Sequence, residues 1–377
     1  MIWYVLVFIL CFIGMILNFC IKDNKKRVIF EIITLIILIL FSGTRYKIGG
    51  WDYEIYHRIF KWTPYLSEFS LNTTNIYNTE IGYLFLNSII KTIGFNFYGF
   101  TLIHSALFYI LLYKGLRKTN INFGFFIIVF LFKSCIFNTF VSMRQSLVIV
   151  IFLNAIPYLI NNKAIKYLLC IIPCIFIHIS SIILIPLVLL RNIKFKKRYF
   201  IIYGLICFGF FILNILNIYK FNIFQLSNTF IANNSLISDK ISNYSNSQAT
   251  INIFSTIEIY AIYILMIHFY NKIYINGSRE KMVVYNLFML ILPIVTIFRN
   301  FEIMIRFRDY FTILEPFILY YIYDCLESKN RFCYVIMLSI LCFIGYYRYI
   351  YTYDTGDNAL RNYKSYLVKD ISIFGDE

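Results

Sequence analysis

Charged residues are scarce in this sequence. Lys, Arg, Asp and Glu make up 14% of the 377 residues, whereas a soluble domain carries roughly 25%. Hydrophobic residues make up 60%, and apolar runs long enough to cross a bilayer as helices recur along the whole chain. An ordinary soluble protein is therefore excluded. We predict an all-α, polytopic integral membrane protein with about 11 to 12 membrane helices, forming a single transmembrane domain over residues 1–377.

Several motifs that carry chemistry in other enzymes are absent. The sequence has no D-x-D to hold a metal-bound nucleotide sugar, no P-loop, no H-E-x-x-H and no G-x-S-x-G. It has nine cysteines but no C-x-x-C, and Cys170 and Cys174 are one helical turn apart. We therefore expect inert thiols and no disulfide framework. We also expect no metal and no cofactor.

The positive charge lies in short clusters between the apolar runs. The formal net charge is +16, but the distribution of Lys and Arg is that of cytoplasmic loops, which argues against a nucleic-acid partner. The clusters set the expected topology. The first apolar run has no basic start and no cleavage site, so we expect a retained span. Outer loops are predicted at about residues 45–79 and 218–251, and an outer tail at about 351–377.

The apolar segment 167–190 differs from the other predicted spans. Pro173, His178 and Pro186 interrupt it, and both of its flanks are basic. A single crossing would place the most basic loop of the protein outside, against the positive-inside rule. Two arms that turn at His178 would keep both flanks inside, because each arm of roughly 18–20 Å is shorter than the roughly 30 Å hydrocarbon core. We favour this broken helical hairpin, with a single crossing as the alternative.

Arginines outside the cytoplasmic clusters gather at predicted outer helix ends. Arg45 follows the second apolar run, and Arg144 begins a later one. Arg306 and Arg308 lie in the charged stretch RNFEIMIRFRDYF. Arginine binds phosphate through a rigid fork, and intramembrane arginines usually line a functional cavity. We therefore predict a site for a lipid-linked phosphate or pyrophosphate, with snorkelling to headgroups as the alternative for each arginine.

Two side chains on the predicted outer side are candidates for a general base. His178 could activate a sugar hydroxyl, and the alternative is a histidine satisfied within the core. Asp52 lies in the stretch RYKIGGWDYEIY, where it could act as the base or only hold an arginine fork. Tyr53 and Tyr56 follow it and could stack on sugar rings. An aromatic belt at the membrane interface explains these tyrosines equally well.

Five stretches, taken in order, resemble one known family. RYKIGGWDYEIYHRIF resembles the R-x-x-x-G-x-D-Y-x-x-Y patch of the EpsG family of membrane proteins, relatives of Wzy-type polysaccharide polymerases. A doubled glycine and a tryptophan before Asp52 depart from that pattern. Later stretches also look similar to segments of the family: EIGYLFLN from Glu80, NTFVSMRQSLVIVIFLNA with Arg144 and Gln145, IFIHISSIILIPL with His178, and RFRDYF from Arg306.

The resemblance implies a metal-independent membrane glycosyltransferase that polymerises exopolysaccharide, capsule or O-antigen. Such an enzyme transfers a growing glycan from undecaprenyl pyrophosphate to a lipid-linked oligosaccharide repeat unit, at the outer face of the bacterial cytoplasmic (inner) membrane. Implied partners are this substrate, membrane lipids, and the flippase and chain-length regulator of the pathway. The implied site has His178 or Asp52 as catalytic residue and, for substrate and pyrophosphate, Arg45, Arg144, Gln145, Arg306, Arg308, Tyr53, Tyr56 and Glu80.

Other classes of membrane protein remain as alternatives. A flippase or transporter of lipid-linked glycans would be built from opposed repeats, and the sequence shows no internal repeat. Another membrane transferase, such as an O-antigen ligase or a sugar acyltransferase, would use similar residues on a different acceptor. A purely structural membrane subunit is the last alternative.

Overall fold

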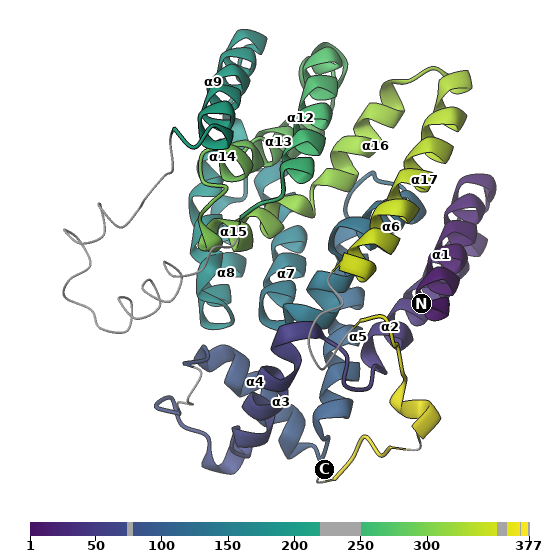
Figure 1. Ribbon diagram of the computed structural model, residues 1–377, viewed down its shortest axis with the longest axis vertical. Coiled ribbons are helices and arrows are strands. Elements are labelled where there is room, and N and C mark those ends of the chain that lie inside the picture. Colours follow the sequence, from purple (N-terminus) through teal and green to yellow (C-terminus); the bar gives the residue numbers. More distant parts are fainter. Residues whose placement is uncertain (74–77, 219–249, 353–359, 370, 376–377) are drawn as a thin grey trace, which may run out of the picture. The chain divides into compact units, whose positions relative to one another are not determined.

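The computed structural model describes residues 1–73, 78–218, 250–352, 360–369 and 371–375 (Figure 1). These residues are mainly helical, and within them the only β-pairing consists of isolated bridges. Among the described residues, five helices are long and apolar enough to cross a membrane, and four shorter apolar helices accompany them. The all-α, multi-pass architecture is thereby confirmed. Most of the predicted outer loop 218–251 and part of the predicted tail 351–377 lie outside the described residues.

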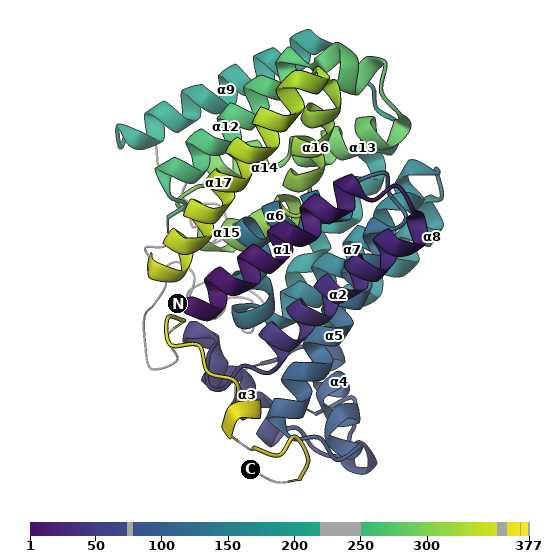
Figure 2. The same ribbon diagram turned by 90° about the vertical axis from the view of Figure 1, so that its right-hand side faces the viewer.

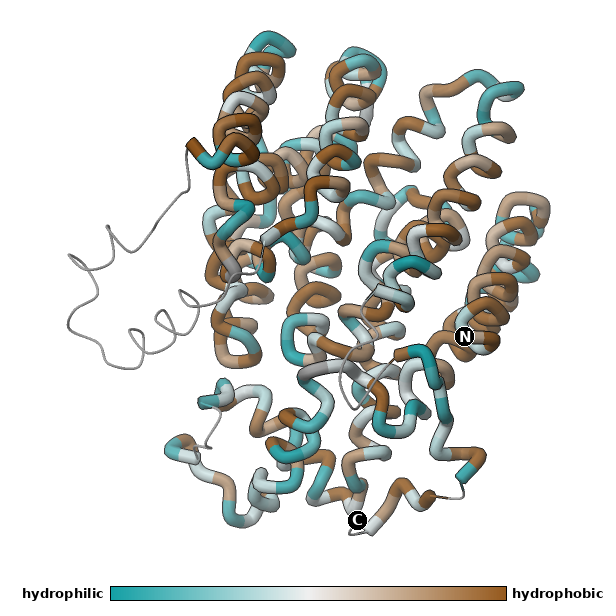
Figure 3. The backbone as a smooth tube through the Cα atoms, in the orientation of Figure 1, coloured by the Kyte–Doolittle hydropathy of each residue, from teal (hydrophilic) through white to brown (hydrophobic). Residues whose placement is uncertain are grey.

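Contacts divide the chain into two compact units. The first comprises Met1–Val188 and Glu327–Glu377, and the second comprises Leu189–Leu326. The single transmembrane domain over residues 1–377 stays a prediction. In both units, the long helices are mostly hydrophobic, whereas the region of the first unit that carries α3 (Tyr53–Trp62) and α4 (Ile81–Thr92) is mixed (Figure 3).

The first unit packs α2 against α5, α5 against α7, and α1 against both α2 and α6 (Figure 2). Its α-helices are α1 (Ile2–Cys20), α2 (Asn24–Gly43), α3 (Tyr53–Trp62), α4 (Ile81–Thr92), α5 (Phe97–Leu116), α6 (Phe123–Phe130), α7 (Met143–Ile160), α8 (Ala164–Ile171) and α17 (Ser328–Thr352). The first unit also contains 3-10 segments at Gly50–Asp52, Leu66–Glu68, Ile172–Phe176 and Tyr366–Lys369, and π-helical segments at Leu131–Cys135 and Phe137–Val141. A further 3-10 segment, Ile179–Asn192, begins in the first unit and ends in the second.

The chain reverses direction around His178. The Tyr167 hydroxyl on one arm donates to the Leu184 carbonyl on the other at 2.7 Å. A continuous helix would hold these residues roughly 25 Å apart, at 1.5 Å per residue. His178 lies between the arms, and its backbone N–H donates to the Cys174 carbonyl at 2.9 Å. The predicted broken hairpin is therefore what the structure contains.

One end of the first unit gathers the segments predicted to lie outside the membrane. The N-terminus contacts the C-terminal segment there, because the Met1 amino group donates to the Arg361 carbonyl at 2.8 Å. The C-terminal segment also pairs with the loop after α2, where the Tyr46 N–H donates to the Lys364 carbonyl at 2.8 Å. It lies close to α3 and α4 in Figure 1. This end carries the candidate site.

The opposite end of the first unit gathers basic residues of the predicted cytoplasmic loops. Glu31, buried on α2, accepts hydrogen bonds from Asn18 at 2.9 Å and from the Tyr113 hydroxyl at 3.0 Å. Arg117 lies 3.6 Å and Arg27 3.9 Å from the same carboxylate. The buried charge is thus paired and ties α1, α2 and α5 together. The separation of the two ends agrees with the predicted topology, while the side of the membrane that each end faces stays a prediction.

The second unit is built around a cluster of buried aromatic side chains. Phe200 packs against Tyr274 and Tyr285, with ring centroids 5.3 and 4.9 Å apart. Its helices are α9 (Lys197–Ile215), α12 (Ile253–His268), a π-helical segment (Asn271–Ile275), α13 (Arg279–Phe288), α14 (Ile291–Thr296), α15 (Glu302–Thr312) and α16 (Glu315–Cys325).

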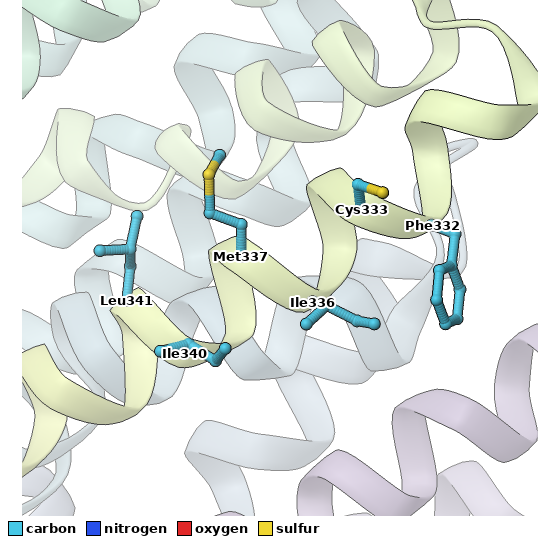
Figure 4. A pocket seen from close by; sticks show the side chains of 6 residues that line it. All are labelled: Phe332, Cys333, Ile336, Met337, Ile340 and Leu341. Carbon is cyan, nitrogen blue, oxygen red and sulfur yellow. The ribbon is translucent and has the colours of Figure 1, made fainter.

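A shallow apolar hollow runs along the outward face of α17 (Figure 4). Its lining residues all belong to this one helix and none is charged: Phe332, Cys333, Ile336, Met337, Ile340 and Leu341. An apolar face of this kind on a membrane helix is suited to contact with lipid chains. It offers no group for the predicted chemistry.

Candidate functional site

One carboxylate joins three elements of the first unit. Glu80 directly precedes α4, and its Oε2 accepts a hydrogen bond from Nη1 of Arg144 at 2.5 Å. Its Oε1 accepts the backbone N–H of Ile179 at 3.2 Å and lies 3.7 Å from Nδ1 of His178. Glu80 therefore links the start of α4, the first turn of α7 and the tip of the broken hairpin. Glu80, Arg144 and His178 are named the Glu80 cluster below.

The Glu80 cluster is largely shielded from solvent. The side chains of Glu80, Arg144 and His178 are 12%, 20% and 7% exposed. Burial acts to raise the pKa of the Glu80 carboxyl, but His178 and the Arg144 guanidinium outweigh it and hold that pKa well below its usual range. Glu80 is therefore ionised at physiological pH, and its charge is compensated by that of Arg144.

A glycine allows α4 to approach the hairpin tip. A Cβ atom on Gly82 would lie 2.6 Å from the Phe176 carbonyl oxygen, which is closer than real Cβ contacts allow. Gly82 lies two residues after Glu80 in the stretch EIGYLFLN. The same short stretch thus supplies both the carboxylate and the close backbone contact that brings the carboxylate to His178.

The helix α7 presents Arg144 because the chain breaks just before it. Two π-helical segments precede Ser142, whose backbone angles (φ −102°, ψ 64°) are not helical, and α7 then begins at Met143. Arg144 accordingly lies in the first turn of α7 and reaches Glu80. Irregular π-helical turns of this kind are frequent at functional sites.

Two tyrosines form an aromatic wall beside Arg144. The guanidinium carbon lies 5.9 Å from the ring centroid of Tyr56 on α3, and Tyr83 on α4 packs edge-on against Tyr56 at 5.9 Å. Burial raises the pKa of the Tyr56 hydroxyl, although the positive charge of Arg144 acts to lower it. Tyr56 therefore lies next to the Glu80 cluster, and its predicted contact with sugar stays a prediction. Tyr53 is as deeply buried as Tyr56, in the same hydrophobic cluster, and packs against Phe97 at 5.4 Å.

Arg45 lies deeper than the sequence suggested. Its side chain is 0% exposed, and its Nε and Nη1 donate to the carbonyls of Ile48 and Ser42 at 2.9 and 2.5 Å. Its Nη2 contacts the sulfur of Met143 at 3.5 Å, and its guanidinium lies over the Phe140 ring. All three guanidinium nitrogens are engaged in this way. We therefore assign Arg45 a structural role, in which it holds the loop after α2 against the start of α7 and does not contact pyrophosphate directly.

The burial of Arg45 makes a testable prediction about stability. Arg45→Met keeps the length of the side chain but leaves the carbonyls of Ser42 and Ile48 without donors, at about 1–3 kcal/mol each. We expect a lower melting temperature of the detergent-purified protein, with Arg348→Met, an exposed position on α17, as the control. An unchanged melting temperature combined with loss of polymer would instead indicate that Arg45 binds substrate.

The remaining predicted residues lie in different surroundings. Gln145 is 1% exposed, and its Oε1 lies 3.4 Å from the Ser142 hydroxyl, so it packs inside the first unit. Asp52 is half-buried at the start of α3, one turn before Tyr56. Arg306 and Arg308 belong to α15 of the second unit, where Arg308 lies 3.2 Å from Asp309. The candidate site is therefore described within the first unit alone.

Two features of the site were missed by sequence reasoning. Tyr83, which is buried beside Tyr56 on α4, three residues after Glu80, is not predicted from the sequence. Glu80 itself was grouped with the ligands of the pyrophosphate, whereas the structure places it between Arg144 and His178. The spacing on α4 is a signal that could have found Tyr83.

A comparison with protein-family models gives a match to the model described as the EpsG family, over residues 28–365. The matched span contains the whole Glu80 cluster and both tyrosines of the aromatic wall. No curated protein matches the chain, and no solved structure does.

Proposed function

Because this chain belongs to the EpsG family, we propose that it polymerises lipid-linked oligosaccharide repeat units into a surface polysaccharide. The family and the apolar helices make it a multi-pass membrane protein of the polysaccharide-polymerase-like kind. In the proposed reaction, a growing glycan passes from undecaprenyl pyrophosphate to the free sugar end of a second lipid-linked repeat unit. The proposed place is the outer face of the bacterial cytoplasmic membrane.

The proposed reaction needs a proton acceptor close to a cation. The acceptor hydroxyl oxygen bonds to the anomeric carbon of the donor sugar, while the bond from that carbon to the pyrophosphate oxygen breaks. The hydroxyl proton passes to a base, and the bonding electron pair leaves with the pyrophosphate. Charge therefore develops on the leaving group, where a fixed cation stabilises the transition state.

The Glu80 cluster is the observation that supports this proposal. It places Arg144 and His178 on the two sides of one carboxylate. Arg144 uses Nη1 for Glu80, and its Nε has no hydrogen-bond partner among the described residues. A guanidinium has five N–H donors in a planar fork, so Arg144 can hold Glu80 and still bind a phosphate oxygen along its other edge. His178 then serves as the base and Tyr56 as a wall for the sugar.

A deletion strain tests the proposed function. Without the protein, we expect single lipid-linked repeat units to accumulate on the outer face of the membrane and long glycan to disappear, with both effects reversed by the wild-type copy. Enzymatic labelling of intact spheroplasts shows on which face the repeat units lie, and mass spectrometry of extracted lipids measures how many repeat units each lipid carries. Repeat units that accumulate on the inner face would indicate a flippase. Polymer that stays on its lipid carrier would indicate a ligase, and a loss of acyl groups alone would indicate an acyltransferase.

Other parts of the proposal rest on the sequence alone. Asp52 remains the alternative base, and Arg306 and Arg308 remain candidates for substrate binding in the second unit. Independence from metal is proposed because the sequence has no D-x-D motif. The flippase and the chain-length regulator remain proposed partners.

A further inference from the structure

We propose that Glu80 is a positioning residue that selects the nitrogen of His178 to which the acceptor hydroxyl gives its proton. The inference rests on the proposed function and refines it, because it gives the carboxylate a role other than substrate binding. It also favours His178 over Asp52 as the base, since the Glu80 cluster is built around the histidine.

The side of the His178 ring that faces Glu80 points to one histidine tautomer. An ionised carboxylate can only accept hydrogen bonds, and Oε1 of Glu80 faces Nδ1 of His178 at 3.7 Å. The neutral imidazole therefore carries its proton on Nδ1, which leaves the lone pair on Nε2 for the acceptor hydroxyl. At 3.7 Å the two atoms lie beyond hydrogen-bond distance in the substrate-free protein. Such contacts in substrate-free sites tighten when substrate binds.

The surroundings of Glu80 exclude a direct role in holding pyrophosphate. Both of its oxygens face protein groups: Oε2 accepts from Arg144, and Oε1 accepts from the backbone N–H of Ile179 and faces Nδ1 of His178. Its negative charge would repel a pyrophosphate. Glu80 therefore acts through its neighbours, as the carboxylate of a Ser-His-Asp triad acts through its histidine. When His178 takes up the proton, the charge of Glu80 also stabilises the imidazolium that forms.

The Glu80 carboxylate also sets the distance between the proposed base, His178, and the proposed pyrophosphate ligand, Arg144. Arg144 belongs to α7 and His178 to the hairpin tip, and Glu80 contacts both from the start of α4. The absence of a side chain at Gly82 allows α4 to lie close to the Phe176 carbonyl at that tip. Catalytic groups must be held within roughly 0.5 Å of their productive positions. A single rigid link between the two groups meets that need.

The test uses the purified full-length protein in lipid nanodiscs, with the lipid-linked repeat unit extracted from the deletion strain as the probe. Glu80→Gln keeps the shape, but its amide N–H₂ can face Nδ1 and move the imidazole proton to Nε2. We expect kcat to fall by about 10- to 100-fold while KM changes by less than about threefold. Glu54→Gln is the matched control, because Glu54 lies 4.0 Å from Nδ1 of His57 in an exposed pair on α3.

Chemical rescue separates positioning from a merely structural role. We expect added formate to restore part of the kcat of Glu80→Ala, since a small carboxylate can occupy the vacated place, and formamide to restore none. A wild-type kcat in Glu80→Gln, a rise in KM alone, or no rescue of a folded Glu80→Ala would overturn the inference. If the wild-type protein itself leaves the repeat units unjoined, the proposed function fails first, so the two failures are distinguishable.

Discussion

Arg144→Lys is expected to lower polymerisation by about 100- to 1,000-fold, although the substitution keeps the positive charge. Arg144 holds Glu80 through Nη1 and has its remaining donors in the same plane. A lysine ammonium is a single point charge and cannot bind a carboxylate and a phosphate in that fixed geometry. Turnover of the purified protein and the chain-length distribution of cellular glycan measure the effect.

A second arginine–glutamate pair in the first unit gives the control for Arg144. Arg117 lies 3.6 Å from Glu31 at the opposite end of the helices, so Arg117→Lys disturbs a comparable pair far from the Glu80 cluster. We expect glycan of normal length from this variant. Normal glycan from Arg144→Lys as well would show that residue 144 need not bind a carboxylate and a phosphate together. Arg144 would then no longer be assigned to the site.

His178→Ala is expected to lower kcat by about 100- to 10,000-fold, the range over which a positioned general base contributes. The protein should remain folded, because the backbone of His178 still donates to Cys174 and the hairpin arms keep the contact between Tyr167 and Leu184. Turnover in nanodiscs and the melting temperature are measured together. Added imidazole is expected to restore part of the activity.

Two further variants make the His178 result specific. His268→Ala removes an exposed histidine at the end of α12 in the second unit and should leave turnover unchanged. Asp52→Asn removes the other candidate base and should retain measurable turnover. An inactive Asp52→Asn together with an active His178→Ala would transfer the role of base to Asp52.

The sequence predicted the helical hairpin because local charge was sufficient evidence. Basic clusters on both sides of residues 167–190 favoured a topology with both flanks on one side of the membrane, and the contact between Tyr167 and Leu184 shows the reversal. The long apolar helices follow from hydropathy in the same way. These features depend on residues close together in the chain, so they can be predicted from a single sequence.

The arrangement of the site could be predicted only in part, because burial and long-range contacts decide it. Arg45 and Arg144 look alike in the sequence, yet Arg45 is 0% exposed and bonded to backbone carbonyls, whereas the Arg144 side chain is 20% exposed. Glu80 meets Arg144 across 64 positions of the chain and Ile179 across 99. No periodicity or spacing reports such contacts. The resemblance to the family pointed to these residues but not to their connection.

Reconstitution with a defined donor and acceptor tests the central claim most directly. Purified protein in nanodiscs is mixed with the lipid-linked repeat unit from the deletion strain, and the products are separated by size and analysed by mass spectrometry. We predict a ladder that grows by one repeat unit at a time, with one lipid pyrophosphate released for each bond formed, and no ladder from Arg144→Lys. Repeat units that stay single with folded wild-type protein, or a ladder of equal length from Arg144→Lys, would contradict the account.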